Sequence, residues 1–384
     1  RIAALFFEGT MRGLFTILFG AGALLFLQRH AERGAGSHGT KLYYRRTLWL
    51  IVFGLINGYV LLWEGDILVF YGVIGLILFF FRDVSARKLL LASALVVALQ
   101  MSVTLVEYSG YMQLRSSAEA AEATLDAGSP LTMEQAMALK ELEREHDNFK
   151  PSQEQLELFI VEVRGSYASA FARIGKRLHY IYTTYFVQHG FGDSLSLMVL
   201  GMALLKLGVL SGAAAESTYR RMILIGYAVG LAINTFEMQQ LERSAFSVEA
   251  LMTSYLTYDL GRIPMTLGHL GLIVLIYRST WFATAARVLA AVGKMALTNY
   301  LAQSLICLFL FTGAGLGWYG QLQRHELYYV VAAICVAQLI WSAWWLRYFQ
   351  FGPLEWLWRS LTYWHVQPMK RSASQAAASP SMLG

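Results

Sequence analysis

The sequence is poor in charged residues for its length. Only 15% of its 384 residues are Asp, Glu, Lys or Arg, whereas a soluble domain carries about 25%. Hydrophobic residues make up 56% of the chain, and apolar runs recur along most of it. This composition excludes a soluble globular domain and predicts an all-α, polytopic bundle of transmembrane helices.

Cysteine and recognised catalytic motifs are also scarce. The two cysteines, Cys307 and Cys335, both lie in apolar stretches, so we expect packed thiols rather than a disulfide or a metal pair. The eight histidines are scattered, and the sequence shows no metal-ligand cluster, phosphate-binding loop, dinucleotide fingerprint or nucleophile elbow. We therefore expect no metal. The net charge of +6 comes from bases between the apolar runs, which favours a role in membrane orientation over nucleic-acid binding.

The stretch Gly54–Gly75 organises the rest of the chain. Two apolar runs, Leu48–Trp63 and Ile67–Phe81, flank the short acidic break Glu64-Gly65-Asp66. Each run is long enough, with a slight tilt or flanking residues, to cross about 30 Å of hydrocarbon at 1.5 Å per residue. The pattern predicts a helical hairpin whose tip reaches one membrane surface.

Basic loops predict the orientation of the hairpin. The loop over residues 29–46 carries five Lys or Arg residues against one acid, so we place it in the cytoplasm together with the C-terminus. An odd number of spans then puts Arg1 outside, and we expect a tenth helix to precede this sequence. The nine predicted spans are Leu14–Gln28, Leu48–Trp63, Ile67–Phe81, Leu89–Val106, Leu195–Leu210, Met222–Phe236, Tyr255–Tyr277, Met295–Phe311 and Tyr328–Tyr348.

Composition divides the chain into four segments. We expect N-terminal membrane helices over 1–106, an extracytoplasmic helical insertion over 107–176, C-terminal membrane helices over 177–365, and a disordered cytoplasmic tail over 366–384. The insertion contains more acids than bases, with helical pieces at Met133–His146 and Gln153–Arg173. Thr132 and Gln135 have capping-box spacing at the start of the first piece. The insertion is either a solvated cap or a lid that gates substrate.

Ionisable residues inside a predicted span are candidates for function because their burial in lipid is costly. Asp259 and Arg262 lie three residues apart on one helical face, where they either neutralise each other or bind an anion or acceptor. His269 follows Arg262 by seven residues and shares that face. It is either a packing histidine or a general base that takes a proton from an acceptor.

A second set of candidates surrounds the hairpin tip. Asp66 opens a helix, where its charge suits the helix dipole, so it is either a cap or a catalytic carboxylate. Asn57 lies seven residues before Glu64 on the same face. Glu64 is either a solvated tip residue or, with Asn57 and Arg12, part of a substrate site at the outer surface.

Other polar residues lie near the predicted cytoplasmic side. Asn299 and Gln303 are one turn apart, which is typical of residues that hydrogen-bond neighbouring helices but also suits a pocket for an acyl thioester. Bases in the cytoplasmic loops either anchor the topology or bind the phosphates of coenzyme A. These bases are Arg45, Arg46, Arg87 and Lys88.

Several stretches together resemble the YeiB-like family of bacterial integral membrane proteins, a family of unknown function (domain of unknown function 418). They are LFTILFGAGALLF at 14–26, WEGDILVFYGVIG at 63–75, LMVLGMALLKLGVLSG at 197–212, VGKMALTNYLAQSLI at 292–306 and FGPLEWLWRSLTY at 351–363. More distantly, the Asp66-Ile67-Leu68 turn and the helix with Gly293 and Asn299-Tyr300 look like those of the transmembrane acyltransferases.

The distant resemblance implies acyl transfer from cytosolic acyl-CoA, as cosubstrate, to an envelope sugar or lipid acceptor across the bacterial inner membrane. In that hypothesis His269 is the base, while Asp66 and Arg262 position groups. Many family members carry His in the helix before the turn, where this chain has Asn57, and an amide cannot act as a base. A transporter, or a lipid- or quinone-binding protein without catalysis, is the alternative. The expected partners are membrane lipids and no nucleic acid, with homo-oligomerisation left open.

Overall fold

The computed structural model describes residues 1–34, 36–279 and 282–371. Within them the regular structure is helical from α1 to α15, and the one β-type contact is an isolated bridge between Phe349 and Lys370. The predicted all-α fold is therefore confirmed. The chain forms two compact units, each described here by itself. The first contains Arg1–Ala21, Asp83–Leu158 and Gln188–Leu275, and the second contains Gly22–Arg82, Phe159–Val187 and Ile276–Gly384.

Several helices are long and apolar enough to cross a membrane, as expected for a membrane protein. A further span results if α12 (Ala283–Lys294) and α13 (Ala296–Phe311), which are bent by 74° at their junction, are counted together. Within the described part of the chain, five stretches are each long and apolar enough to be a span on their own. They are Ile2–Glu32 (α1, Ile2–Phe6, with α2, Thr10–Glu32), Ala86–Asp126 (α5), Glu216–Arg243 (α10), Val248–Arg278 (α11) and Arg324–Tyr348 (α14).

The two arms of the predicted hairpin form shorter helices. The first arm covers the end of α3 (Gly36–Leu55) and a π-helical turn, η1 (Ile56–Val60). The second contains α4 (Leu68–Leu78) and a 3-10 turn, η2 (Phe79–Phe81). The second arm, Leu68–Phe81, is shorter than a full membrane crossing, whereas α3 and η1 together continue from Gly36 to Val60. The count of nine spans therefore stays a prediction.

Two glycines allow close helix packing in the first unit. A Cβ on Gly201 of α9 (Phe191–Lys206) would lie 2.0 Å from the carbonyl oxygen of Ile17 in α2, and a Cβ on Gly20 would lie 2.0 Å from that of Met198. Small residues at such contacts let helix backbones approach closely. Buried side chains complete this core: Leu14, Ile17, Leu197, Leu200, Leu204, Val209, Tyr219 and Leu270.

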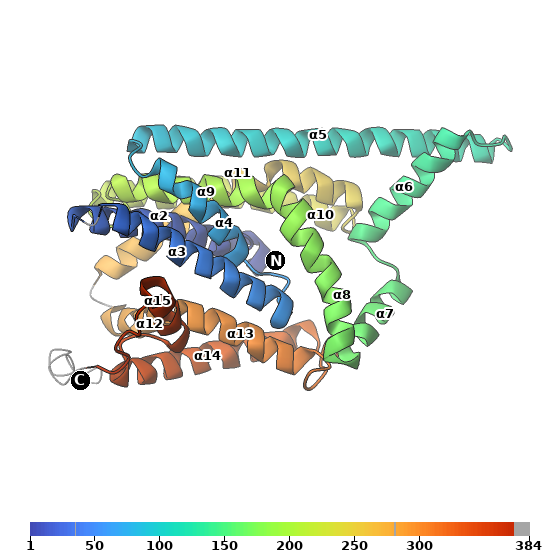
Figure 1. Cartoon of the computed structure of the whole chain (residues 1–384). Coiled ribbons are helices and arrows are strands. Elements are labelled where there is room, and N and C mark those ends of the chain that lie inside the picture. The colour runs from blue at the N-terminus through green and yellow to red at the C-terminus, as the bar shows by residue number, and fades with distance from the viewer. Residues whose placement is uncertain (35, 280–281, 372–384) are drawn as a thin grey trace. The chain divides into compact units, whose positions relative to one another are not determined.

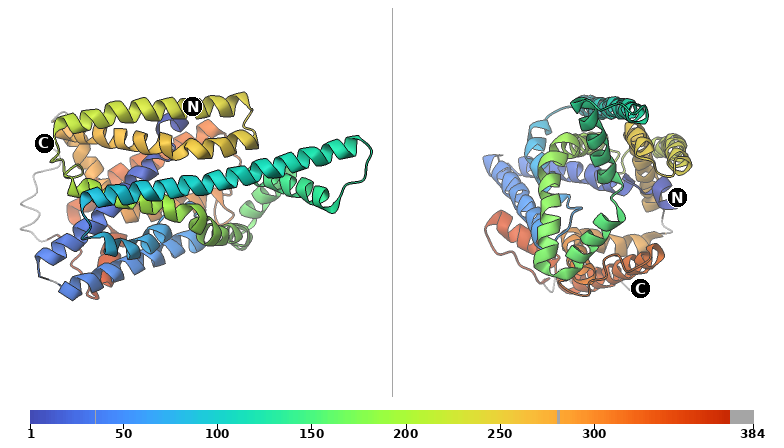
Figure 2. Two further views of the ribbon diagram at one scale, coloured as in Figure 1. Left: turned by 90° about the horizontal axis from the view of Figure 1, so that it is seen from above. Right: turned by 90° about the vertical axis from the view of Figure 1, so that its right-hand side faces the viewer.

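The helices α10 and α11 run side by side, as Figure 2 shows in its left panel. Their contact is again made by glycines. A Cβ on Gly226 would lie 2.4 Å from the carbonyl oxygen of Pro264 and 2.8 Å from the backbone of Gly268. The close approach brings the polar stretch of α11, with Asp259 and Arg262, into the interior of the first unit.

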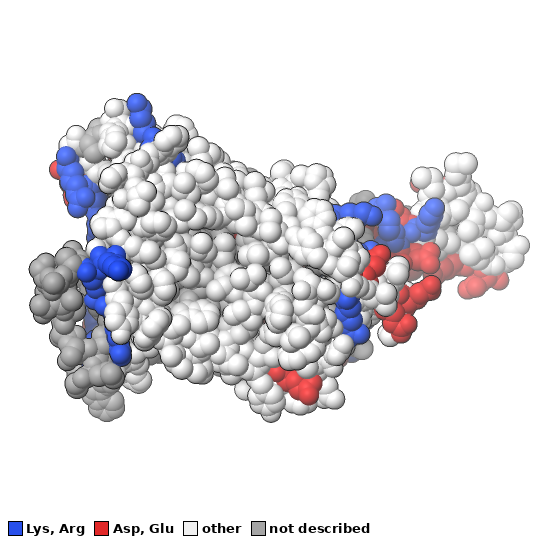
Figure 3. Space-filling view, turned by 60° about the horizontal axis from the view of Figure 1, so that its bottom comes forward, with Lys and Arg blue, Asp and Glu red and all other residues white. Residues whose placement is uncertain are grey.

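The helix α5 continues for 41 residues, so the predicted insertion begins inside it rather than at a break. Figure 1 shows α5 as one uninterrupted helix with α6 (Met133–Phe149) at its far end, and Figure 3 shows acidic side chains gathered where this extension lies. Residues after Val106 are rich in Ala and Glu, which are strong helix formers. Helix formation therefore continues although the hydropathy falls.

The start of α6 confirms one local prediction. The N–H of Gln135 donates to the hydroxyl of Thr132, and the Thr132 N–H donates to the Gln135 side chain, which completes a capping box. The second predicted piece of the insertion is two helices, α7 (Gln153–Gly165) and α8 (Tyr167–Tyr180). They separate because the Ser166 hydroxyl caps α8 through the N–H of Ser169.

The second unit contains the hairpin and the last helices of the chain. Gly72 in α4 faces α3, where a Cβ would lie 2.4 Å from Ile51. The last helix, α15 (Pro353–Tyr363), packs on α3, and the Trp358 indole donates to the carbonyl of Arg46 at 2.9 Å. A π-helical segment, η3 (Ile181–Gly190), continues from α8. Of the predicted tail 366–384, residues 372–384 lie outside the described residues.

The glycine contact in the first unit generates a prediction. Gly201→Ala places a methyl group against the Ile17 carbonyl, so we expect the free energy of unfolding to fall by about 1–3 kcal/mol. Thermal unfolding in detergent measures this change. The matched control is Gly110→Ala, because Gly110 lies exposed in α5 with no described atom within 4 Å of a Cβ. The control should be neutral or stabilising by up to about 1 kcal/mol, and equal losses in both variants would contradict the packing argument.

Candidate functional site

The Asp66 side chain closes the tip of the hairpin in the second unit. Asp66 is 3% exposed. Its Oδ2 accepts from the N–H of Val69 at 3.0 Å in the first turn of α4, and its Oδ1 accepts from the Asn57 Nδ2 at 2.9 Å. The carboxylate therefore joins the two arms of the hairpin. Burial raises the pKa of Asp66 above its usual range, and these two hydrogen bonds oppose that rise.

Two tyrosines complete the tip, and neither was among the candidate site residues predicted from the sequence. The Tyr300 hydroxyl accepts from the Ile67 N–H at 3.2 Å and donates to the Gly65 carbonyl at 3.2 Å. The Tyr182 hydroxyl from η3 donates to the Gly54 carbonyl at 3.5 Å and lies beside Asp66. Tyr300 follows Asn299 in the stretch VGKMALTNYLAQSLI at 292–306, whereas nothing in the local pattern distinguishes Tyr182 from its aromatic neighbours.

The Glu64 carboxylate is only half satisfied. Its Oε2 lies 3.2 Å from the Arg177 Nε in α8, while its Oε1 is buried without a hydrogen-bond partner among the described residues. The side chain is 28% exposed, so Glu64 is partly shielded from solvent, and its place in a substrate site stays a prediction. Burial raises the pKa of Glu64, and the charges of Arg177 and Arg173 partly oppose this rise.

Glu64 also borders an apolar pocket of about 470 Å³ that lies wholly within the second unit. Its wall includes Leu62, Val163, Ile174 and Leu308, and Glu64 is the one charged residue among the described residues that line it. A pocket of this volume, lined by hydrocarbon with a few polar groups, is typical of a small-molecule or lipid site.

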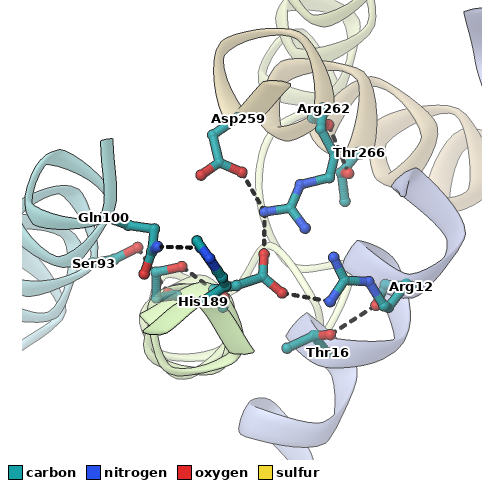
Figure 4. A network of polar contacts seen from close by, with 10 residues as sticks. Arg12, Thr16, Ser93, Gln100, His189, Asp259, Arg262 and Thr266 are labelled. Atoms are coloured by element: carbon teal, nitrogen blue, oxygen red, sulfur yellow. Dashed lines mark hydrogen bonds and ion pairs between the residues drawn. The ribbon is translucent and has the colours of Figure 1, made fainter. Parts of the chain in front are cut away.

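A buried ionic cluster lies in the first unit, where it joins three helices (Figure 4). The Arg12 Nη1 lies 2.6 Å from the Asp193 Oδ2. The Arg262 Nη2 pairs with the Asp193 Oδ1 and lies 2.5 Å from the Asp259 Oδ1. Sequence reasoning grouped Asp259 with Arg262 but missed Asp193, whose one signal is a lone acid directly before an apolar run.

His269 lies in the interior of the first unit. Its Nδ1–H donates to the Met265 carbonyl at 2.9 Å within α11, which leaves Nε2 as the acceptor nitrogen. The ring packs edge-on against Phe7 and Tyr227, at centroid distances of 5.9 and 5.4 Å. These contacts agree with a packing histidine, and its role as a base stays a prediction. Asp66, the other predicted catalytic residue, belongs to the second unit.

The predicted polar pair of α13 binds the neighbouring helix α14. The Asn299 Nδ2 donates to the Ser342 hydroxyl at 3.0 Å, and the Trp341 indole donates to the Asn299 Oδ1 at 2.7 Å. The Gln303 Nε2 donates to the Gln338 Oε1 at 2.9 Å. Both side chains therefore make the interhelical hydrogen bonds that their spacing suggested, and a thioester pocket at this place stays a prediction.

The bases proposed for coenzyme A fall in both units. Arg46 stacks on Trp358 at 4.6 Å, and Arg45 donates to the Thr362 carbonyl at 3.0 Å, so both tie α3 to α15. Arg87 and Lys88 are exposed in the first turn of α5, in the first unit. A phosphate site that uses all four stays a prediction. Within the described residues no group of three or more His, Cys, Asp or Glu could hold a metal.

The Asn57–Asp66 hydrogen bond generates a prediction about stability. Asn57→Ala removes the amide that donates to the buried Asp66 Oδ1, so we expect the free energy of unfolding to fall by about 1–3 kcal/mol. A double-mutant cycle with Asp66→Asn measures the coupling, and purely additive losses would show that the two side chains act independently. Asn148→Ala in α6, an exposed position, is the control and should change little.

The raised pKa of Glu64 generates a prediction about pH. Between the ordinary pKa of 4.5 and the raised folded value, the folded chain holds more protons than the unfolded chain, so stability falls as pH rises through that window. We expect Glu64→Gln to flatten the dependence of the unfolding temperature on pH above 4.5. Glu143→Gln, at an exposed site in α6, should keep the wild-type profile. Parallel profiles for wild type and Glu64→Gln would contradict the prediction.

Comparison with known proteins shows similarity to one family and to two bacterial proteins. The family described as "Protein of unknown function (DUF418)" matches residues 204–365. "Uncharacterized protein YxaH" of Bacillus subtilis (strain 168) is 27% identical over 372 residues, which cover 93% of this chain and 80% of the relative. "Uncharacterized protein YeiB" of Escherichia coli (strain K12) is 29% identical over 353 residues, which cover 91% of this chain and 80% of the relative.

No solved structure matches the chain. The two similarities to whole proteins extend well beyond the region matched by the family, and they include the hairpin that carries Asn57, Glu64 and Asp66. The resemblance to YeiB noted in the sequence is thereby confirmed. Residues 204–365 of this chain match the DUF418 family of proteins of unknown function, and most of the chain is similar to two uncharacterized bacterial proteins.

Proposed function

We propose that this chain is a lipid-handling membrane protein whose second unit binds the hydrocarbon chain of an amphiphile. The observation that carries the proposal is the apolar pocket of about 470 Å³ below Trp63, Glu64 and Gly65 of the hairpin tip. Its lining suits an acyl or isoprenyl chain, and Glu64 supplies one charged group at the wall. The bacterial relatives and the basic loops support a place in the bacterial inner membrane with a cytoplasmic C-terminus.

Selectivity in such a site depends on the head group. Each buried CH₂ contributes about 0.8 kcal/mol when a chain leaves water, but a chain that leaves the bilayer gains little, because lipid tails are already apolar. The polar groups at the wall therefore decide which amphiphile stays bound. Glu64 is the charged group at the wall, and Arg177 pairs with it from α8.

Acyl transfer is the reaction that we propose for this site. An acceptor hydroxyl on an envelope sugar or lipid attacks the thioester carbonyl of acyl-CoA, the carbon–sulfur bond breaks, and the thiol of coenzyme A leaves with the proton. Two observations support Glu64 as the base in this step: its Oε1 has no hydrogen-bond partner among the described residues, and burial raises its pKa above the usual range. Asp66 positions the hairpin, because Asn57 and Val69 each bind one of its oxygens.

The two native cysteines provide a test of chain binding. Cys307 lines the pocket, and Cys335 is exposed on α14. In Cys335→Ser protein, held in a fluorinated surfactant that competes poorly for a hydrocarbon pocket, we expect palmitoyl-CoA to slow alkylation of Cys307 by N-ethylmaleimide at least fivefold. In Cys307→Ser protein the rate at Cys335 should not change. Equal rates at Cys307 with and without palmitoyl-CoA would overturn the pocket assignment.

A Glu64→Gln substitution in the Cys335→Ser protein separates binding from chemistry. If Glu64 is the base, palmitoyl-CoA should still protect Cys307 in this variant, but the variant should not transfer a radiolabelled acyl group to an envelope lipid extract. His269→Ala tests the rival base predicted from the sequence, and Glu143→Gln is the control. Transfer that persists in Glu64→Gln and is lost in His269→Ala would reassign the base to His269.

A further inference from the structure

Arg262 in the first unit has more hydrogen-bond donors than partners. Its side chain is 2% exposed. The Nη2 donors reach Asp193 and Asp259, whereas Nε and Nη1 are buried without a hydrogen-bond partner among the described residues. Buried donors on a charged group are unfavourable when they stay unsatisfied. The arrangement therefore indicates an acceptor that the described residues do not supply.

The position of that acceptor follows from the cluster. Figure 4 shows the terminal nitrogen of Arg262 that makes no drawn contact on the side of the guanidinium that faces Arg12. A group bound there would contact two guanidinium ions, one from α11 and one from α2. The Arg12 side chain is 37% exposed, so Arg12 lies at the more open edge of the cluster, where a ligand can enter.

The charge of the cluster limits the ligand. Arg12 and Arg262 carry two positive charges, and Asp193 and Asp259 carry two negative charges, so the four groups are neutral together. Adding a multiply charged anion to a neutral buried cluster is costly, whereas a single charge facing the two guanidinium groups is favourable. Guanidinium groups match phosphate oxygens in geometry.

We propose that Arg262, with Arg12 at the open edge, is a binding site for a singly charged phosphate group. The group is either the phosphodiester of a phospholipid head or free dihydrogen phosphate. This site is independent of the acyl-chain pocket in the second unit, so failure of either proposal leaves the other standing.

The test uses the full chain in detergent with two probes. Native mass spectrometry measures retention of phosphatidylglycerol, and thermal unfolding in sodium phosphate is compared with unfolding in sodium chloride at equal ionic strength. We expect Arg262→Lys, which keeps the charge but loses the fork of donors, to weaken phosphate-group binding at least tenfold. The control is Arg220→Gln, because Arg220 is 69% exposed in α10, and it should bind like the wild type.

A second readout keeps the test decisive if Arg262→Lys does not fold. In wild-type protein labelled with ¹⁵N-arginine, phosphate should shift one Nε–H resonance by nuclear magnetic resonance, and chloride should not. Binding of phosphatidylglycerol alone supports the lipid head as the source, and binding of inorganic phosphate as well supports the free ion. Absence of both, or identical binding in wild type and folded Arg262→Lys, overturns the proposal.

Discussion

The hydrogen bond between Asn57 and Asp66 is the contact on which the second unit depends. It joins the two arms of a hairpin at a break where the backbone leaves the helix. In an apolar medium every polar group at such a break needs a partner within the protein. Asp66 satisfies the Val69 N–H, and the Tyr300 hydroxyl satisfies Ile67 and Gly65. The anchored tip then holds Glu64 at the wall of the pocket.

The sequence predicted features that depend on one helix or on one turn. The apolar runs, the hairpin break and the capping box at Thr132 all follow from residues a few positions apart. It did not predict Asp193 in the ionic cluster or Tyr182 beside Asp66. These contacts join elements that are far apart in the chain, and the periodicity of one helix reports only which face is apolar. Glu64 was ambiguous for the same reason, since Arg177 and the pocket wall come from other helices.

The two units solve the problem of buried charge differently. In the first, the charges of two arginines and two aspartates cancel (Arg12, Asp193, Arg262 and Asp259), and two nitrogens of the Arg262 guanidinium have no hydrogen-bond partner among the described residues. In the second, a carboxylate with one unsatisfied oxygen borders a cavity lined by hydrocarbon. The first arrangement suits an anion, and the second suits an apolar chain with a polar end. A phospholipid or a lipid-linked sugar carries both kinds of group, so both proposals point to amphiphiles of the envelope.

The π-helical turns have a consequence for how this family can change. Asn57 lies in η1 and Tyr182 lies in η3, and a π turn contains one residue more than the α-helical turn that it replaces. Loss of a single residue from η1 would restore a regular helix and rotate the preceding residues by about 100° relative to those that follow. The amide of residue 57 would then turn away from Asp66 while the helix itself stayed intact. Relatives that differ by one residue in length here therefore differ in what faces the hairpin tip, even where their aligned residues are identical.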